Sequence, residues 1–235
     1  MGEGADESLL GARVVGFSPW FATAHGTQAS LVALPVENIA VAPDTLSSAQ
    51  LTTIGLNGLT AWRAVDEFDP KPGETIVVTG AAGSVGGFVL ELVVAKGARV
   101  IAAVSGRDRE SVLALGASGV VAREDGDLGA AVRQVLPDGA DGLIDTASLA
   151  GAALGAIRDG GRYVTTTMAP EPVRGVLIAG IYARPDAAAL ATLVDMASAG
   201  RLHTPVAREF DVSEVRAAYQ EFAAGSHRGR IVLTF

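Results

Sequence analysis

The stretch that decides the fold is Ile76-Val-Val-Thr-Gly80-Ala-Ala-Gly83-Ser-Val-Gly86-Gly87, in which a β-branched run leads directly into a glycine-rich turn. Apolar residues at helical spacing follow it, and a second apolar run occupies Arg99–Val104. This order of strand, turn, helix and strand is typical of a βαβ unit whose turn holds a pyrophosphate. Gly83 would let the backbone approach the phosphates, and Gly86 would let the helix pack closely on the strand. The alternative is a glycine turn that closes a βα unit without any ligand.

The alternation of strands and helices continues along the chain. Near-continuously apolar strands separated by helices of about ten residues predict a doubly wound parallel α/β sheet that is covered on both faces. The predicted strands are Thr75–Thr79, Arg99–Val104, Gly119–Val121, Gly142–Asp145 and Arg162–Thr166, and the predicted helices are Ser84–Lys96, Asp108–Leu115, Leu128–Leu136 and Leu149–Ile157.

The flanking segments predict further elements. Two β-like runs, Arg13–Phe17 and Ala29–Leu34, open the chain, and Leu46–Phe68 reads as two helical pieces joined by a bend at its glycines. The last elements are predicted as helix Pro185–Ala199, strand Val206–Phe210, helix Ser213–Ala224 and strand Gly229–Phe235. The final strand needs a partner, for which the opening strands are the candidates.

Composition narrows the classes of function. The 235 residues are 49% hydrophobic and 19% charged, which is typical of a folded globular protein. A net charge of -8 argues against binding to nucleic acid or to an anionic membrane surface. The sequence has no cysteine and three histidines, His25, His203 and His227, so a protein-held metal is not expected. No apolar run reaches the roughly 18 residues of a membrane span, and the acidic start lacks the order of a signal peptide, so a cytoplasmic location is expected.

The end of the second strand of the βαβ unit indicates which dinucleotide would bind. An Asp or Glu there would accept the ribose 2′-hydroxyl of NAD, but the chain continues Ser105-Gly-Arg107-Asp-Arg109. A hydroxyl and two guanidinium groups suit a 2′-phosphate, which favours NADP. The alternative is that both arginines only solvate the start of a helix, partly neutralised by Asp108 and Glu110.

The chain resembles the medium-chain dehydrogenase/reductase superfamily, in its zinc-free quinone oxidoreductase branch. The stretches that carry the resemblance are Gly58-Leu-Thr60-Ala-Trp62, Pro72-Gly-Glu-Thr75, Ala81-Ala-Gly-Ser-Val-Gly86, Leu115-Gly-Ala117, Asp145-Thr146, Gly160-Gly-Arg162 and Gly229-Arg-Ile-Val-Leu233. The resemblance implies a Rossmann sheet with a partial, β-rich, chaperonin-like catalytic domain that lacks its first strands. Residues 1–52 would form that partial domain, 53–200 the dinucleotide-binding domain, and 201–235 a segment that returns to the catalytic domain.

The same resemblance implies an oxidoreductase that reduces a quinone or an α,β-unsaturated carbonyl compound with NADPH. Hydride transfer needs positioning and a polarising hydrogen bond more than a nucleophile, because the cofactor supplies the hydride. Without cysteine, zinc-dependent alcohol dehydrogenase chemistry of the family's other branch is excluded. The alternative is a shortened homologue without hydride transfer, which would act as a non-redox enzyme or as a partner or regulatory subunit.

Candidate site residues follow from the turn, the strand ends and the resemblance. Thr60 and Tyr182 are the predicted catalytic residues. Tyr163, expected in the core, and His25, expected in a solvated loop, are weaker candidates for a proton donor. The predicted cofactor-binding residues are Thr60, Gly80, Ala82, Gly83, Ser84, Val85, Gly86, Ser105, Arg107, Arg109, Thr146, Thr165 and Thr166. The threonines could instead be β-branched residues that simply favour strand ends. A homodimer formed through the edge strand Gly175–Ile181 is expected, by resemblance and because exposed strand edges need cover.

Overall fold

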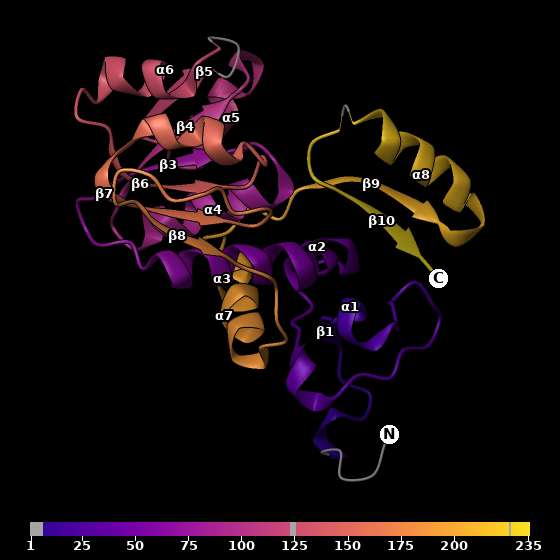
Figure 1. Ribbon diagram of the computed structural model, residues 1–235. Helices are drawn as coiled ribbons and strands as arrows, with labels where there is room; N and C mark the ends of the chain where they lie inside the picture. The colour runs from indigo at the N-terminus through magenta and orange to yellow at the C-terminus, as the bar shows by residue number, and fades with distance from the viewer. Residues whose placement is uncertain (1–6, 123–125, 226) are drawn as a thin grey trace. The chain divides into compact units, whose positions relative to one another are not determined.

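The computed structural model describes residues 7–122, 126–225 and 227–235. The chain divides into two compact units, of which the first combines the residues up to Leu59 with Ala183–Phe235 and the second is Thr60–Tyr182 (Figure 1). Helix α7, Ala187–Ser198, lies in the first unit, whereas the sequence predicts a dinucleotide-binding domain over residues 53–200.

The second unit is built on a six-stranded parallel sheet, which confirms the predicted α/β class. Its order is β5-β4-β3-β6-β7-β8, so the chain moves outward from β3 in one direction and then returns to the other side of β3. The ends of β3 and β6 consequently flank the switch point at which doubly wound sheets bind ligands. The strands are β3 Thr75–Thr79, β4 Arg99–Val104, β5 Gly119–Ala122, β6 Ala140–Asp145, β7 Ile157–Thr165 and β8 Leu177–Gly180.

The helices of this unit cover the sheet. They are α3 Leu59–Phe68, α4 Ser84–Ala95, α5 Arg109–Ala114, α6 Leu128–Val135 and the 3-10 helices Gly106–Asp108 and Ala150–Ala156. The segment predicted as helix Leu149–Ile157 is thus 3-10 rather than α-helical. Its small residues permit close approach to α6, because a Cβ added at Gly129 would lie 2.8 Å from the Cα of Gly155.

The core of the second unit lies on the central strands. Every residue of β3 is buried, as its unbroken apolar pattern predicts. Val77, Leu143 and Tyr163, which lie on three neighbouring strands, belong to one buried cluster into which α6 inserts Val132.

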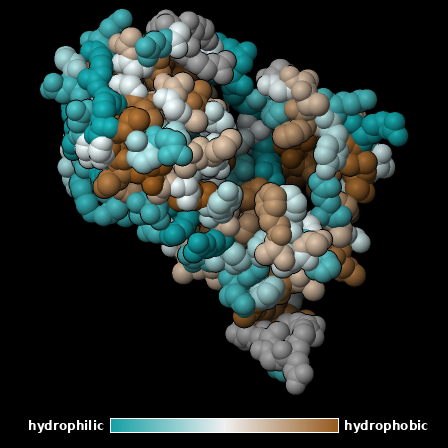
Figure 2. All heavy atoms as spheres, in the orientation of Figure 1, coloured by the Kyte–Doolittle hydropathy of each residue, from teal (hydrophilic) through white to brown (hydrophobic). Residues whose placement is uncertain are grey.

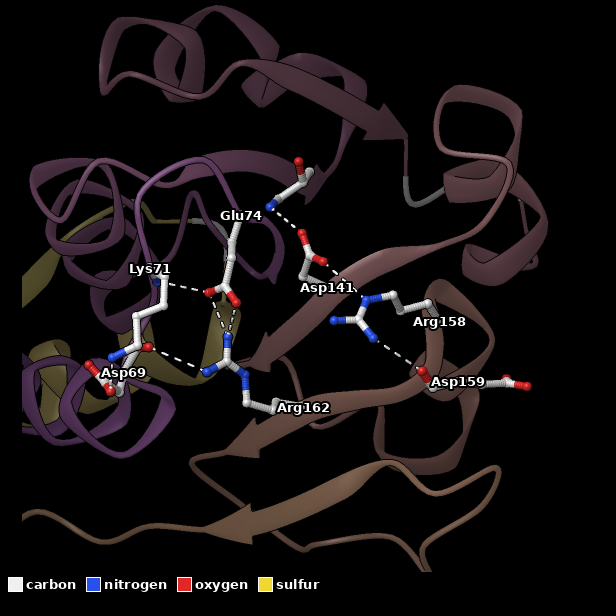
Figure 3. Close-up of polar contacts among 8 residues, drawn as sticks. Asp69, Lys71, Glu74, Asp141, Arg158, Asp159 and Arg162 are labelled. Atoms are coloured by element: carbon white, nitrogen blue, oxygen red, sulfur yellow. Dashed lines mark hydrogen bonds and ion pairs between the residues drawn. The ribbon is translucent and has the colours of Figure 1, made fainter.

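Charged side chains gather at the amino edge of the sheet, where the parallel strands begin (Figure 3). One guanidinium nitrogen of Arg162 donates to both carboxylate oxygens of Glu74 at 2.5 Å. Asp141 accepts from the backbone N–H of Thr75 at 2.8 Å and from Arg158 at 3.1 Å. Burial alone would raise the pKa of Asp141, but these two hydrogen bonds outweigh it and lower the pKa. Ion pairs and a hydrogen bond to the backbone therefore link the neighbouring strands at this edge.

The first unit carries two separate two-stranded sheets. Strand β1 Val14–Gly16 pairs antiparallel with β2 Ile39–Val41, and β9 Val206–Asp211 pairs parallel with β10 Arg230–Thr234. Its helices are α1 Trp20–Thr23, α2 Ser48–Thr53, α7 and α8 Val215–Ala224, with 3-10 turns at Glu7–Leu9, Val36–Asn38 and Val212–Glu214. A π-helical turn, Ile54–Gly58, joins α2 to α3 where a bend was predicted.

Two predictions for this unit were wrong. The run Ala29–Leu34 is not a strand: Leu31 is 90% exposed, and the strand that pairs with β1 begins only at Ile39, after the 3-10 turn Val36–Asn38. The final strand pairs with β9 rather than with the opening strands, because α8 returns the chain directly beside β9. Within the described ranges, no helix has the length and apolar character needed to span a membrane.

Replacing Gly142 or Gly151 by alanine should change the stability of the protein by different amounts, because only Gly142 is tightly packed. A Cβ at Gly142 would lie 2.4 Å from a ring carbon of Phe68 and 2.5 Å from the backbone oxygen of Arg162, whereas one at Gly151 would meet nothing within 4 Å. Gly142→Ala should therefore lower the free energy of unfolding by about 2 kcal/mol or more, and Gly151→Ala by less than about 0.5 kcal/mol. Urea denaturation of both variants measures this, and equal losses would contradict the packing.

Candidate active site

The glycine-rich turn connects the end of β3 to α4. Gly80 ends the strand with φ +62°, a left-handed conformation, and its carbonyl accepts from the N–H of Gly83 at 2.8 Å. A Cβ at Gly86 would lie 2.1 Å from the carbonyl oxygen of Gly80, so the turn requires glycine at Gly86. Gly83 instead is exposed, with extended backbone, and caps α4 without a side chain. Helix α4 has twelve residues and is capped by Gly83, which has no side chain. A phosphate can therefore approach the N–H groups of its first turn.

The loop after β6 is locked against this turn. The hydroxyl of Thr146 donates to the backbone oxygen of Thr79 at 2.7 Å, and the N–H of Thr146 donates to the hydroxyl of Thr79 at 3.1 Å. The Thr146 hydroxyl also occupies the space that a Cβ at Gly86 would enter, 2.8 Å away. The structure therefore brings the predicted residues Gly80, Gly86 and Thr146 together.

Asp145 is the buried centre of this region, with an exposed fraction of zero. From the described residues its carboxylate accepts five hydrogen bonds of 2.6–3.0 Å, donated by the hydroxyls of Thr79 and Tyr163 and by the N–H groups of Ala147, Leu149 and Ala150. Burial alone would raise the pKa of Asp145, but these hydrogen bonds lower it, so the group remains a carboxylate.

Tyr163 is buried, as expected, and its hydroxyl is committed to Asp145. Burial and the hydrogen bond to the carboxylate both raise the pKa of Tyr163, so it stays protonated as the donor. Sequence reasoning missed the role of Asp145. The available signal was a carboxylate at the end of an apolar strand, beside a strand that ends in Thr79.

The two candidate threonines at the end of β7, Thr165 and Thr166, differ in position. Thr165 is fully buried, and its hydroxyl accepts from the N–H of Thr167 at 3.0 Å. Thr166 is half-buried, and its N–H donates to the backbone oxygen of Asp145 at 3.2 Å. Thr166 therefore lies at the carboxyl edge beside the loop after β6.

The residues expected to select the dinucleotide follow β4. Ser105 precedes the 3-10 turn Gly106–Asp108, and both Arg107 and Arg109 are exposed. The Arg107 guanidinium lies 3.9 Å from a carboxylate oxygen of Asp108, which is at the outer limit of an ion pair, and the Arg107 side chain is 65% exposed. Both guanidinium groups are thus accessible to an anion.

The remaining candidates occupy different places. Ala82, Ser84 and Val85 are half-buried in the turn and the first turn of α4. Thr60 is half-buried near the start of α3, and Tyr182, just beyond β8, is 77% exposed. His25 is exposed in the loop after α1. The roles of these residues remain predictions.

Comparison with known proteins gives consistent matches. The sequence profile described as "zinc-binding dehydrogenase" matches residues 115–233. Crotonyl-CoA carboxylase/reductase of Cereibacter sphaeroides is 31% identical over 132 residues, which are 52% of this chain and 30% of that protein. The putative quinone oxidoreductase YhfP of Bacillus subtilis is 27% identical over 230 residues, covering 88% of this chain and 69% of that one.

A solved structure gives the same result. The putative alcohol dehydrogenase from Sinorhizobium meliloti 1021 superimposes with a TM-score of 0.81 at 28% identity, covering 100% of this chain and 72% of that one. The chain spans less than a third of the carboxylase/reductase and about two thirds of the other two proteins.

The profile's description implies zinc, but the donor set of this chain does not fit such a site. The sequence has no cysteine to supply thiolate ligands. Within residues 7–122, 126–225 and 227–235, no group of three or more His, Asp or Glu side chains is placed to hold a metal ion.

Neighbouring glycines of α4 should respond oppositely to alanine. Gly86→Ala places a methyl group against the carbonyl of Gly80 and should lower the free energy of unfolding by about 3 kcal/mol. In Gly87→Ala the methyl group would lie 3.6 Å from the nearest atom, and alanine's higher helix propensity should stabilise by about 0.5–1 kcal/mol. Chemical denaturation measures both, and similar shifts would refute the close contact.

Proposed function

We propose, since this chain belongs to the medium-chain dehydrogenase/reductase superfamily, that it is an oxidoreductase which transfers hydride from NADPH to a quinone or an α,β-unsaturated carbonyl compound. The observation that carries the proposal is the turn after β3. Gly83 leaves the N-terminus of α4 open to a phosphate, while Thr146 and Thr166 lie at the same edge of the sheet.

The chemistry divides between cofactor and protein. Bound NADPH supplies the hydride. The first N–H groups of α4 bind the pyrophosphate, and Thr146 and Thr166 orient the nicotinamide half. The exposed Tyr182 hydroxyl would donate a hydrogen bond that polarises the substrate carbonyl, and Thr60 would help to position the nicotinamide. The reduced product would take up its proton from solvent.

The decisive experiment measures NADPH binding and NADPH oxidation together. Calorimetry gives the affinity, and the loss of NADPH absorbance with a simple benzoquinone or enone gives turnover. We expect both binding and turnover. Tight binding without turnover with either acceptor class would favour the alternative, a homologue without hydride transfer, and the absence of binding would overturn the proposal.

The end of β4 should select NADPH over NADH. Ser105, Arg107 and Arg109 offer charge-assisted contacts to a 2′-phosphate, so NADPH should bind tighter by about 1–3 kcal/mol. Arg107→Ala should weaken NADPH binding and leave NADH binding nearly unchanged. The matched control is Arg99→Ala, which removes an exposed arginine from the opposite end of β4. Equal affinities of the wild type for both dinucleotides would contradict the selection.

The open edge of the sheet supports a homodimer. Among the strands that the structure describes, β8 is at the edge of the six-stranded sheet and pairs with β7, and Leu177 on β8 is 68% exposed. Figure 2 shows hydrophobic residues gathered on the side of the second unit where β7 and β8 lie, amid a more hydrophilic surface. Pairing of two β8 strands would satisfy the free backbone groups and cover apolar surface.

Light scattering at micromolar concentration should therefore give twice the monomer mass. Leu177→Lys should shift the mass toward the monomer, because it puts a charge into the proposed contact. Val135→Lys, which changes another exposed apolar residue at the end of α6, should leave the dimer intact. A monomeric wild type would refute this assembly.

A further inference from the structure

The second unit buries the hydroxyl of Tyr163 in its apolar core, a position that a phenylalanine could fill equally well. Tyr163 lies on β7 within the apolar cluster of the sheet. Its ring fills the core as a phenylalanine would, but its hydroxyl donates to Asp145 at 2.7 Å. Burying a hydroxyl and a carboxylate is costly unless both are hydrogen-bonded, so this pair carries a specific structural constraint.

That constraint acts on the loop 146–150. Three of the five donors to the Asp145 carboxylate are backbone N–H groups of this loop. Ser148 and Ala150 have φ values of +59° and +49°, a left-handed conformation that costs about 1 kcal/mol or more for a residue other than glycine. The carboxylate therefore holds the loop in a conformation that the sequence of the loop does not favour by itself.

The side-chain network continues to the glycine-rich turn, whose Gly80 N–H donates to the backbone oxygen of Ala103 on β4 at 3.2 Å, while Arg107 and Arg109 lie beyond the end of β4. Asp145 accepts from Thr79, Thr79 accepts from the N–H of Thr146, and the Thr146 hydroxyl fills the space beside Gly86. Its members thus come from the ends of β7, β6 and β3, while Arg107 and Arg109 follow β4.

We propose that Tyr163 is a positioning residue: through Asp145 it holds the loop 146–150 in the form that receives the nicotinamide half of the dinucleotide. The inference rests on the proposed function and adds a residue that contacts neither cofactor nor substrate. Without the Tyr163 hydroxyl, the loop should spend part of its time in other conformations, and the apparent affinity for the whole dinucleotide should fall by that fraction.

The test compares two ligands on the same protein, NADPH and adenosine 2′,5′-bisphosphate. The bisphosphate carries the adenosine half and its phosphates and lacks the nicotinamide half. In Tyr163→Phe, the loss of one hydrogen bond should weaken NADPH binding roughly three- to tenfold, while bisphosphate binding stays within about twofold of the wild type. Calorimetry measures both affinities, and thermal melting is recorded for each protein.

Two further variants separate positioning from general stability. Thr79→Val removes another hydroxyl of the same network and should give the same selective loss of NADPH affinity. Asp141→Asn weakens a hydrogen-bonded carboxylate at the opposite end of β6 (Figure 3), and it should lower the melting temperature without changing the ratio of the two affinities.

The outcomes distinguish this inference from the proposed function. If the wild type binds NADPH but Tyr163→Phe weakens both ligands equally, or neither, Tyr163 is only structural and the inference is overturned. A selective loss that also appears in Asp141→Asn would overturn it as well, because any destabilisation would then suffice. If the wild type binds no NADPH, the proposed function is wrong, and the inference that rests on it is wrong as well.

Discussion

The contact on which the second unit depends is the approach of α4 to the end of β3. The helix begins so close to the strand that the Cα of Gly86 faces the carbonyl oxygen of Gly80 with no room for a Cβ. This approach fixes the direction of α4 and leaves the N–H groups of its first turn at the edge of the sheet. The absence of a side chain at Gly86 also leaves space for the Thr146 hydroxyl, so the same contact helps to position the loop after β6.

The two edges of the sheet are stabilised differently, and the difference matters for function. At the amino edge, carboxylates and guanidinium groups pair with one another in partly exposed positions, as Glu74 and Arg162 do. At the carboxyl edge, one fully buried carboxylate gathers hydroxyl and backbone N–H donors, while the arginines after β4 remain exposed. At the first edge carboxylates and guanidinium groups face one another, whereas the second edge carries the exposed Arg107 and Arg109 and the N-terminus of α4, groups that attract anions.

The sequence predicted the sheet of the second unit well, because buried parallel strands read as unbroken apolar runs. Strands β3 and β4 begin and end at the predicted residues. The prediction failed at residues 29–34, a short apolar run that stays exposed because no strand pairs with it in the described structure. It also failed for the partner of β10, because strand pairing depends on tertiary contacts that the sequence pattern does not show. Glycines at predicted positions of the turn do lie against Thr146, but periodicity could not reveal the Asp145 network. Its donors come from strands β3 and β7 and from the loop after β6, which only the folded sheet brings together.

The paired strands β9 and β10 of the first unit have a consequence for dynamics. Of their residues, only Phe210 and Val232 are buried, whereas every residue of β3 is buried between two hydrogen-bonded neighbours. We expect such a two-stranded ladder to open locally at a lower cost in free energy than β3, so its amide hydrogens should exchange with solvent faster. The amides of β3 should exchange mainly when the sheet as a whole opens. The chain would then combine a slowly exchanging scaffold, which carries the candidate site, with a ladder that opens more often.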